Sequence, residues 1–329
     1  MIYQKKWLVL LLIIGLACLV LKILLDSKFG HSAFVYVGVP FLVAVALLAF
    51  VKSGSETSDV PNENLVESSE SPEEPLEDSE SDAGFLFKFV FWSLVVMLST
   101  SVFLGEGFIC VLMFMPIYFG IVFLIALIVV LIRKAEKKGK DKRYVHIIPA
   151  LIVVSSFEGV VPEFEFNRDY SVTRDILVSA SPEQIHSHLM SPMALDVDRH
   201  WLLEIFPMPT NIDAETLSAG DIHTIDFVYH RWFVTNTHEG SMQLEISEMD
   251  DNYIRTSFLE NSSYIKNYLE LEGTEIHFEA IDDQSTKVSL TIHYQRFLDP
   301  VWYFGPLQSY AIGEVADLLL EELFVPTQR

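Results

Sequence analysis

The first half of the chain is a series of long apolar runs, and the second half alternates apolar and polar residues. Crossing about 30 Å of hydrocarbon takes roughly 20 mostly apolar residues in a helix. Four runs have that length, and we expect membrane spans near residues 7–25, 33–51, 85–104 and 108–132. The pattern therefore predicts a multi-pass α-helical membrane region within residues 1–162.

A fifth apolar stretch, residues 144–161, is shorter and leaves two readings open. We expect it to cross the membrane, which would carry the rest of the chain out of the cytoplasm. In the alternative it lies along the interface, and the rest of the chain stays in the cytoplasm. Lys5 and Lys6 precede the first span, and a Lys/Arg-rich run at 133–143 follows the fourth. This bias predicts a multi-pass protein of the cytoplasmic (inner) membrane with a cytoplasmic N-terminus.

Residues 53–84 separate the second and third apolar runs and are rich in Ser, Glu and Pro. Acidic residues recur throughout this loop, and Lys and Arg are missing from it. Such a composition cannot bury enough apolar surface to offset the entropy of ordering the chain. We expect a disordered, solvated linker, with a docking tail as the alternative.

The alternation of apolar and polar residues begins near Tyr170. Val172, Ile176 and Val178 share one side of the stretch YSVTRDILVSA, which predicts a strand. Ser181, Pro182 and Gln184 then form the pattern of an N-cap, a first helical position and a capping box. The residues 163–329 thus open with a strand followed by a short helix.

Several more strands follow, with apolar residues on alternate positions. Gly273 lies where the apolar parity changes, so we expect a β-bulge there. Asp282 to Ser285 has the composition of a hairpin turn. The predicted strands are Ile222–Val234, one around Met242–Ile246, one around Ile254–Phe258, Tyr268–Ile281 and Lys287–Phe297.

A long amphipathic helix ends the chain. We expect it to begin at Pro306 and to press one apolar face, comprising Leu307, Ala311, Val315, Leu318 and Leu319, onto the sheet. The acidic residues of this helix lie on the opposite face. An antiparallel sheet with one apolar face must bury that face. The predicted fold class of residues 163–329 is α+β, with a curved antiparallel sheet around the C-terminal helix.

This layout resembles the START-related helix-grip superfamily (SRPBCC), which includes polyketide cyclase-like proteins and a bacterial subgroup with N-terminal membrane spans. The matching stretches are VTRDILVSASPEQIHSHL, FPMP at 206–209 and YLELEGTEIHFEAIDDQSTKVSLTIHYQRFLDPVWYF. They cover about Tyr170 to Phe324. In that subgroup an Arg often follows the Gly of the strand after the Pro motif, whereas this chain has His223 there. The resemblance implies a ligand cavity between the long helix and the sheet.

The charge balance excludes one class of partner. The formal net charge is −23, and phosphate binding needs clustered Lys and Arg, so we expect no nucleic acid. Two cysteines inside apolar runs predict neither a disulfide framework nor a Cys-based metal site. The ten histidines have no metal-ligand spacing, and no nucleotide or hydrolase motif occurs, so we expect no metal and no cofactor.

Six side chains are candidates for lining the implied cavity. Arg231 and Arg296 have the parity of apolar strand positions, and a buried Arg needs a carboxylate from the protein or from a ligand. The alternatives are that the arginine head groups lie in solvent at the rim of the sheet and that the aromatic side chains belong to the ordinary core. The candidate ligand-binding residues are Arg231, Tyr294, Arg296, His223, Tyr310 and Trp302.

Three functions remain open. The first is a membrane-anchored module that binds a lipid or other apolar small molecule, with the bilayer as its other partner. The second is a cyclase- or aromatase-like enzyme in which Tyr294, Arg296 or His223 polarises a carbonyl. The third is a non-catalytic structural or sensory membrane protein whose cavity is filled by side chains.

Overall fold

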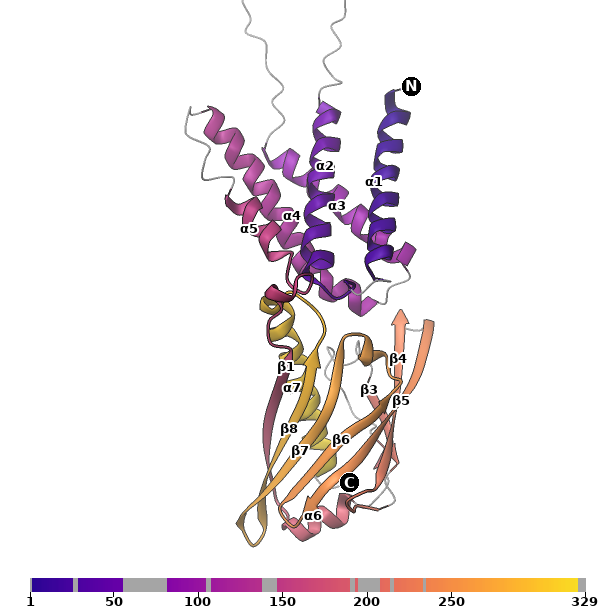
Figure 1. Ribbon diagram of the computed structural model, residues 1–329, viewed down its shortest axis with the longest axis vertical. Coiled ribbons are helices and arrows are strands. Elements are labelled where there is room, and N and C mark those ends of the chain that lie inside the picture. The colour runs from indigo at the N-terminus through magenta and orange to yellow at the C-terminus, as the bar shows by residue number, and fades with distance from the viewer. Residues whose placement is uncertain are drawn as a thin grey trace, which may run out of the picture. The chain divides into compact units, whose positions relative to one another are not determined.

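The computed structural model divides the chain into two compact units, which are described separately (Figure 1). The first unit comprises Met1–Glu106 and Met113–Val161, and the second comprises Gly107–Leu112 and Pro162–Arg329. The structure describes residues 2–25, 29–55, 82–104, 108–137, 147–189, 193–194, 208–213, 216–232 and 235–324. Most of the predicted acidic linker, residues 56–81, lies outside these ranges.

Apolar helices make up the first unit. They are α1 (Ile2–Leu25), the π-helix η1 (Phe34–Gly38), α2 (Val39–Ser55), α3 (Asp82–Leu104), α4 (Phe108–Lys137) and α5 (Ile147–Ser155). The four longest correspond to the four predicted spans. Among the described residues, one stretch of 22 residues, Val111–Ile132, is apolar and long enough to cross a bilayer, and three other apolar stretches have 10–17 residues. A membrane region with several spans stays a prediction.

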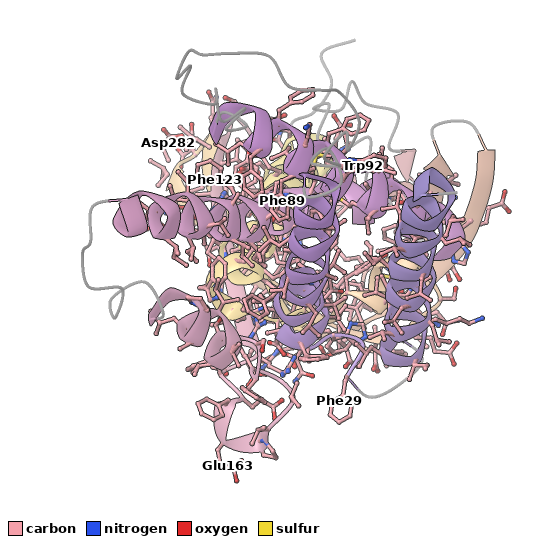
Figure 2. All side chains as sticks on the ribbon, turned by 90° about the horizontal axis from the view of Figure 1, so that it is seen from above. Phe29, Phe89, Trp92, Phe123, Glu163 and Asp282 are labelled. Atoms are coloured by element: carbon pink, nitrogen blue, oxygen red, sulfur yellow. The ribbon has the colours of Figure 1, made fainter. Side chains whose placement is uncertain are left out.

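Hydrogen bonds and ring contacts connect parts of this unit, and they include the following two hydrogen bonds. The Tyr118 hydroxyl of α4 donates a hydrogen bond to the carbonyl oxygen of Ser93 in α3 at 3.0 Å. The amide of Ala33, just before η1, donates to the carbonyl oxygen of Glu158, which follows α5, at 3.0 Å. Apolar side chains also cover much of the outside of this unit, Phe123 of α4 among them, while Phe89 of α3 is buried (Figure 2).

Helix α5 is short. Its nine residues rise about 14 Å at roughly 1.5 Å per residue, which is about half the thickness of the hydrocarbon. Turns, rather than helix, continue from Phe157 to Val160. The predicted fifth span over 144–161 is therefore not a single continuous helix within the described part of that stretch.

The second unit is an eight-stranded antiparallel sheet with a long C-terminal helix (Figure 1). The spatial order is β1-β8-β7-β6-β5-β4-β3-β2, so the first strand pairs with the last and the others are sequential neighbours. The strands are β1 (Asp169–Val178), β2 (Met193–Ala194), β3 (Met208–Asp213), β4 (Ile222–Trp232), β5 (Thr235–Asp250), β6 (Tyr253–Asn261), β7 (Leu269–Asp282) and β8 (Ser285–Arg296). Their helices are η3 (Pro162–Phe164), α6 (Pro182–Leu189), η5 (Tyr264–Asn267) and α7 (Val301–Phe324).

Local sequence signals predict several details of this unit. The capping box at the start of α6 is confirmed, since the Ser181 amide donates to Gln184 Oε1 at 3.0 Å and the Gln184 amide donates to Ser181 Oγ at 3.4 Å. The register between β7 and β8 shifts between Leu271 and Gly273, which confirms the bulge. A Cβ on Gly273 would collide with the carbonyl oxygen of Thr256, so this close approach of β6 requires glycine.

The buried side of the sheet follows strict alternation. In β8 every even-numbered residue from Thr286 to Arg296 is buried, and the odd-numbered residues are partly exposed. These buried side chains form a core with β1, β7, α6 and α7, whose members include Val172, Phe278, Ile292 and Leu320. Helix α7 contacts β1 and β8 (Figure 1). The sheet edge formed by β1 and β8 is thus the one that the C-terminal helix closes.

Two predictions about the last helix were wrong. Helix α7 begins at Val301, one turn before Pro306, because only the carbonyl of Trp302 loses a helical hydrogen bond to the proline and Trp302 is exposed. The face pressed onto the sheet is also different. It consists of Phe304, Gly305, Gln308, Ile312, Gly313, Ala316, Leu320 and Phe324, and small residues among them permit close approach. Of the predicted face, Leu307, Ala311, Val315 and Leu318 are only partly buried beside it, and Leu319 packs against the core.

Candidate functional site

Tyr294 and Arg296 lie together on the inner face of β8, beneath the first half of α7. The Tyr294 hydroxyl is 3.0 Å from Ser309 Oγ of α7, and its ring stacks on Tyr170 with 5.8 Å between ring centroids. Burial raises the pKa of the Tyr294 phenol. Tyr294 is therefore a neutral hydroxyl near neutral pH and joins β8 to α7 through a hydrogen bond.

The guanidinium of Arg296 is fully buried and is matched by a carboxylate of the protein itself. Its side-chain relative exposure is 0%, and its Nη1 lies 2.7 Å from Asp299 Oδ1 and also contacts the carbonyl oxygen of Leu298. The other oxygen of Asp299 lies 2.8 Å from Nη2 of Arg168, which precedes β1. Asp299 thus lies between two arginines, and sequence inspection had missed it.

Arg168 extends this network along the backbone. Its Nη1 donates to the carbonyl oxygen of Phe297 at 2.7 Å, and its Nε donates to Glu165 at 2.7 Å. Burial by itself lowers the pKa of Arg168, but the nearby carboxylates of Asp299 and Glu165 together outweigh it, so that the pKa is raised. The group formed by Arg168, Arg296 and Asp299 ties the chain entering β1 to the turn that leads into α7. The i, i+3 spacing of Arg296 and Asp299 was the signal that could have revealed it.

His223 lies on the same inner face but on β4. It is 7% exposed, whereas the preceding Ile222 is 55% exposed, so the imidazole lies on the buried side. Its Nε2 is 2.7 Å from the carbonyl oxygen of Thr216. The register pairs His223 with Leu244 of β5, and Leu244 in turn with Phe258 of β6. Three strands, β5, β6 and β7, separate His223 from Tyr294.

Of the other three candidates, two lie away from this face, and the side chain of the third is outside the described residues. Trp302 is 59% exposed and Tyr310 is 49% exposed, and both belong to the outward part of α7. Arg231 lies in β4, but its side chain is outside the described residues, so its predicted role stays a prediction. Among the described residues, no group of three or more His, Cys, Asp or Glu could hold a metal ion.

Apolar residues between these polar groups are incompletely covered by the rest of the described chain. Leu244, Phe258 and Ile225 point to the inner side of the sheet and are partly buried. Leu307, Ala311, Val315 and Leu318 are partly buried on α7 and, like the three strand residues, lie outside the main core cluster. Gln308, next in the chain to Leu307, donates from Nε2 to the carbonyl oxygen of Tyr268 at 3.1 Å. These two apolar surfaces are the candidate ligand-binding site.

A search of solved structures found likenesses that cover about half of this chain. The chain is similar to a START superfamily protein from Mycobacterium smegmatis (14% identity, 46% of this chain and 93% of that chain, TM-score 0.33). It is similar to truncated norcoclaurine synthase from Thalictrum flavum (12% identity, 50% of this chain and 99% of that chain, TM-score 0.31). It is also similar to the Zhui aromatase/cyclase from a Streptomyces species (14% identity, 46% of this chain and 89% of that chain, TM-score 0.28). No family model and no curated protein matches the chain.

These likenesses are weak in sequence and in TM-score, so the fold is defined by the chain's own geometry. Residues 169–324 form a curled antiparallel sheet whose first and last strands pair, with a long C-terminal helix across that pair. That is the helix-grip arrangement. Fold alone does not assign an activity.

Proposed function

We propose that residues 163–329 bind a lipid or another apolar small molecule between α7 and the inner face of the sheet, beside a membrane in which the first unit is embedded. The observation that supports this most directly is the pair of partly buried apolar surfaces. One consists of Ile225, Leu244 and Phe258, and the other of Leu307, Ala311, Val315 and Leu318. Covering such surfaces stabilises a complex by roughly 25 cal/mol per Å² of apolar area removed from water.

The membrane part of the proposal has its own support. Apolar side chains remain exposed on the first unit, including Leu12 of α1, Phe87 of α3 and Phe123 of α4. Exposed apolar surface on this scale is typical of helices whose solvent is lipid. The Lys/Arg bias favours a cytoplasmic N-terminus. Whether the second unit lies inside or outside depends on residues 144–161.

An enzymatic role has less support from the geometry. A carbonyl-polarising pair must reach one substrate atom from two sides at hydrogen-bond distance. Tyr294 already bonds Ser309, Arg296 already pairs with Asp299, and His223 is separated from both by three strands. Binding without turnover is therefore the function that these residues favour, with cyclase-like chemistry and a structural or sensory role as the alternatives.

The test is to purify the full chain and two α7 variants in lipid nanodiscs and to extract what co-purifies for mass spectrometry. We expect an apolar molecule enriched over empty nanodiscs. Ala311→Trp should remove it, because the indole would occupy the space beside Leu307 and Val315. Tyr310→Trp, on the outward part of the same helix, is the matched control and should retain it. Equal recovery from all three proteins would contradict the proposal.

A further inference from the structure

The ring of His223 has a fixed orientation toward one backbone group. Its Nε2 is 2.7 Å from the carbonyl oxygen of Thr216, and a carbonyl oxygen can only accept a hydrogen bond. Nε2 therefore carries the hydrogen, an assignment that follows from the partner. In the neutral imidazole, Nδ1 then has the lone pair and is a hydrogen-bond acceptor. Within the described part of the chain, the Thr216 contact is the only hydrogen bond of this ring.

The neighbours of His223 across β5 and β6 are apolar. Leu244, its partner on β5, and Phe258, the partner of Leu244 on β6, have no side-chain hydrogen-bond donor. Both are partly buried, so a molecule covering them would also lie next to the imidazole. A ligand that supplies a donor at this position gains the corresponding hydrogen bond.

Charge at the other end of the same face is already neutralised. The guanidinium of Arg296 is held by Asp299, which is also paired with Arg168. A ligand carboxylate would have to lose its water to reach a guanidinium that is fully buried and already paired with Asp299, and it would meet an acceptor at His223. Burying an unpaired charge is much more costly than burying a hydroxyl that is hydrogen-bonded.

From this arrangement we infer that the ligand of the proposed site is an uncharged apolar molecule bearing a hydroxyl group, and that this hydroxyl donates to Nδ1 of His223. The inference rests on the proposed binding function and adds its chemical class. From β4 to β8 there are four strand spacings, about 19 Å along the curled sheet at roughly 4.8 Å each. The apolar part of the molecule would extend from His223 over Leu244 and Phe258 toward Tyr294.

Three probes that share one alkyl chain separate the possible head groups. They are para-nonylphenol, its methyl ether, which cannot donate a hydrogen bond, and para-nonylbenzoate, which is an anion. Binding to the full chain in nanodiscs is measured by equilibrium dialysis, with empty nanodiscs subtracted for partitioning into lipid. We expect the phenol to bind about tenfold more tightly than the ether, the effect of one hydrogen bond. The benzoate should bind most weakly.

Variants of the chain test whether His223 causes the preference for the phenol over its methyl ether. In His223→Phe the phenol and the ether should bind equally, whereas His223→Asn, which keeps an acceptor near Nδ1, should restore part of the preference. His277→Phe is the matched control, since His277 is exposed on β7 and pairs with Tyr253 across the sheet. It should leave the preference unchanged. Thermal unfolding of each variant verifies that it is folded.

The outcomes distinguish this inference from the function on which it rests. Equal binding of phenol and ether to the unmodified protein would overturn the inference while retaining an apolar site. The inference is equally overturned if the benzoate binds best or if His223→Phe keeps the preference for phenol. If none of the three probes binds, both the inference and the proposed function fail.

Discussion

At the scale of single residues, the most consequential charge is that of Asp299. It lies between the buried guanidinium of Arg296 and that of Arg168, and it connects the start of β1 to the entry of α7. Removing one partner of a buried ion pair leaves the other charge uncompensated. A ligand is not required to explain why Arg296 is buried, because the protein supplies the carboxylate.

We therefore predict that Asp299→Asn lowers the free energy of unfolding of the second unit by about 3 kcal/mol. Urea unfolding followed by far-ultraviolet circular dichroism of the full chain measures this change. Glu165→Gln is the control, since Glu165 is half-exposed in its pair with Arg168 and should cost less than about 1 kcal/mol. Equal small losses in both variants would show that Asp299 does not compensate the two arginines.

Gln308 of α7 is a buried residue with one unpaired hydrogen-bonding atom among the described residues. It is 4% exposed, and its Oε1 has no hydrogen-bond donor among the described residues. The carbonyl oxygen that its Nε2 contacts, that of Tyr268, also accepts from the Phe297 amide at 3.2 Å. Replacing Gln308 by leucine would remove the unpaired acceptor without leaving that carbonyl unsatisfied.

We expect Gln308→Leu to be neutral or to stabilise the protein by up to about 1 kcal/mol. The midpoint of thermal unfolding is the measurement. Ser309→Ala, the adjacent position on α7, provides the contrast, because it removes the partner of the Tyr294 hydroxyl and should destabilise the protein. A clear loss of stability in Gln308→Leu would indicate that Oε1 has a partner, such as an ordered water.

At the scale of elements, two glycines allow backbone segments to approach closely. Gly273 of β7 lies against the carbonyl oxygen of Thr256 in β6, and Gly313 of α7 lies against the guanidinium of Arg174 in β1. The first obstacle is backbone within a paired sheet, and the second is the end of a flexible side chain. The two sites therefore differ in how easily the neighbour can move.

Gly273→Ala should destabilise the second unit by about 1–3 kcal/mol, because β6 must move away from β7 to make room for the methyl group. Gly313→Ala should cost less, since Arg174 can move, although its contact with Asp317 at 3.1 Å would be weakened. Chemical denaturation of both variants ranks them. If Gly313→Ala were the more harmful, the packing of α7 on β1 would be tighter than the mobility of Arg174 implies.

At the scale of the whole molecule, the predicted number of membrane crossings would determine on which side of the membrane the second unit lies. The predicted fifth crossing over 144–161 contains a helix of nine residues, which reaches about half of the hydrocarbon thickness. An interfacial position of this stretch would leave four crossings and a cytoplasmic second unit. A fifth crossing would need turns or flanking residues to complete it.

A reporter fused after Arg329 that is active on only one side of the membrane distinguishes these topologies. Activity in the cytoplasm is expected if α5 lies at the interface, and activity outside if residues 144–161 cross. A second fusion, placed in the 56–81 segment, is the control and should report the cytoplasm in either case, because two crossings precede it in both. An external signal from that control would refute the orientation inferred from the Lys/Arg bias.

Local and periodic features of this protein are determined by its sequence. Alternation in β8, the capping box at Ser181 and Gln184, and the bulge at Gly273 depend on neighbouring residues, whose steric and hydrogen-bonding preferences are local. The same holds for the order of six of the eight strands and of helices α6 and α7, and therefore for the α+β class, whereas the short strands β2 and β3 were not predicted. These features could be read before any long-range contact was known.

Only the tertiary structure decided which face of α7 is buried and which charged groups are paired. The stripe containing Leu307 and Ala311 is apolar, but the buried face has Gly305, Gly313 and Ala316, and the two glycines lie close to side chains of β1. Asp299 meets Arg168 across more than a hundred residues of sequence, and His223 faces the same side of the sheet as Tyr294 only because of strand register. Packing and ion pairing between distant segments depend on three-dimensional geometry, which residue spacing in the chain does not contain.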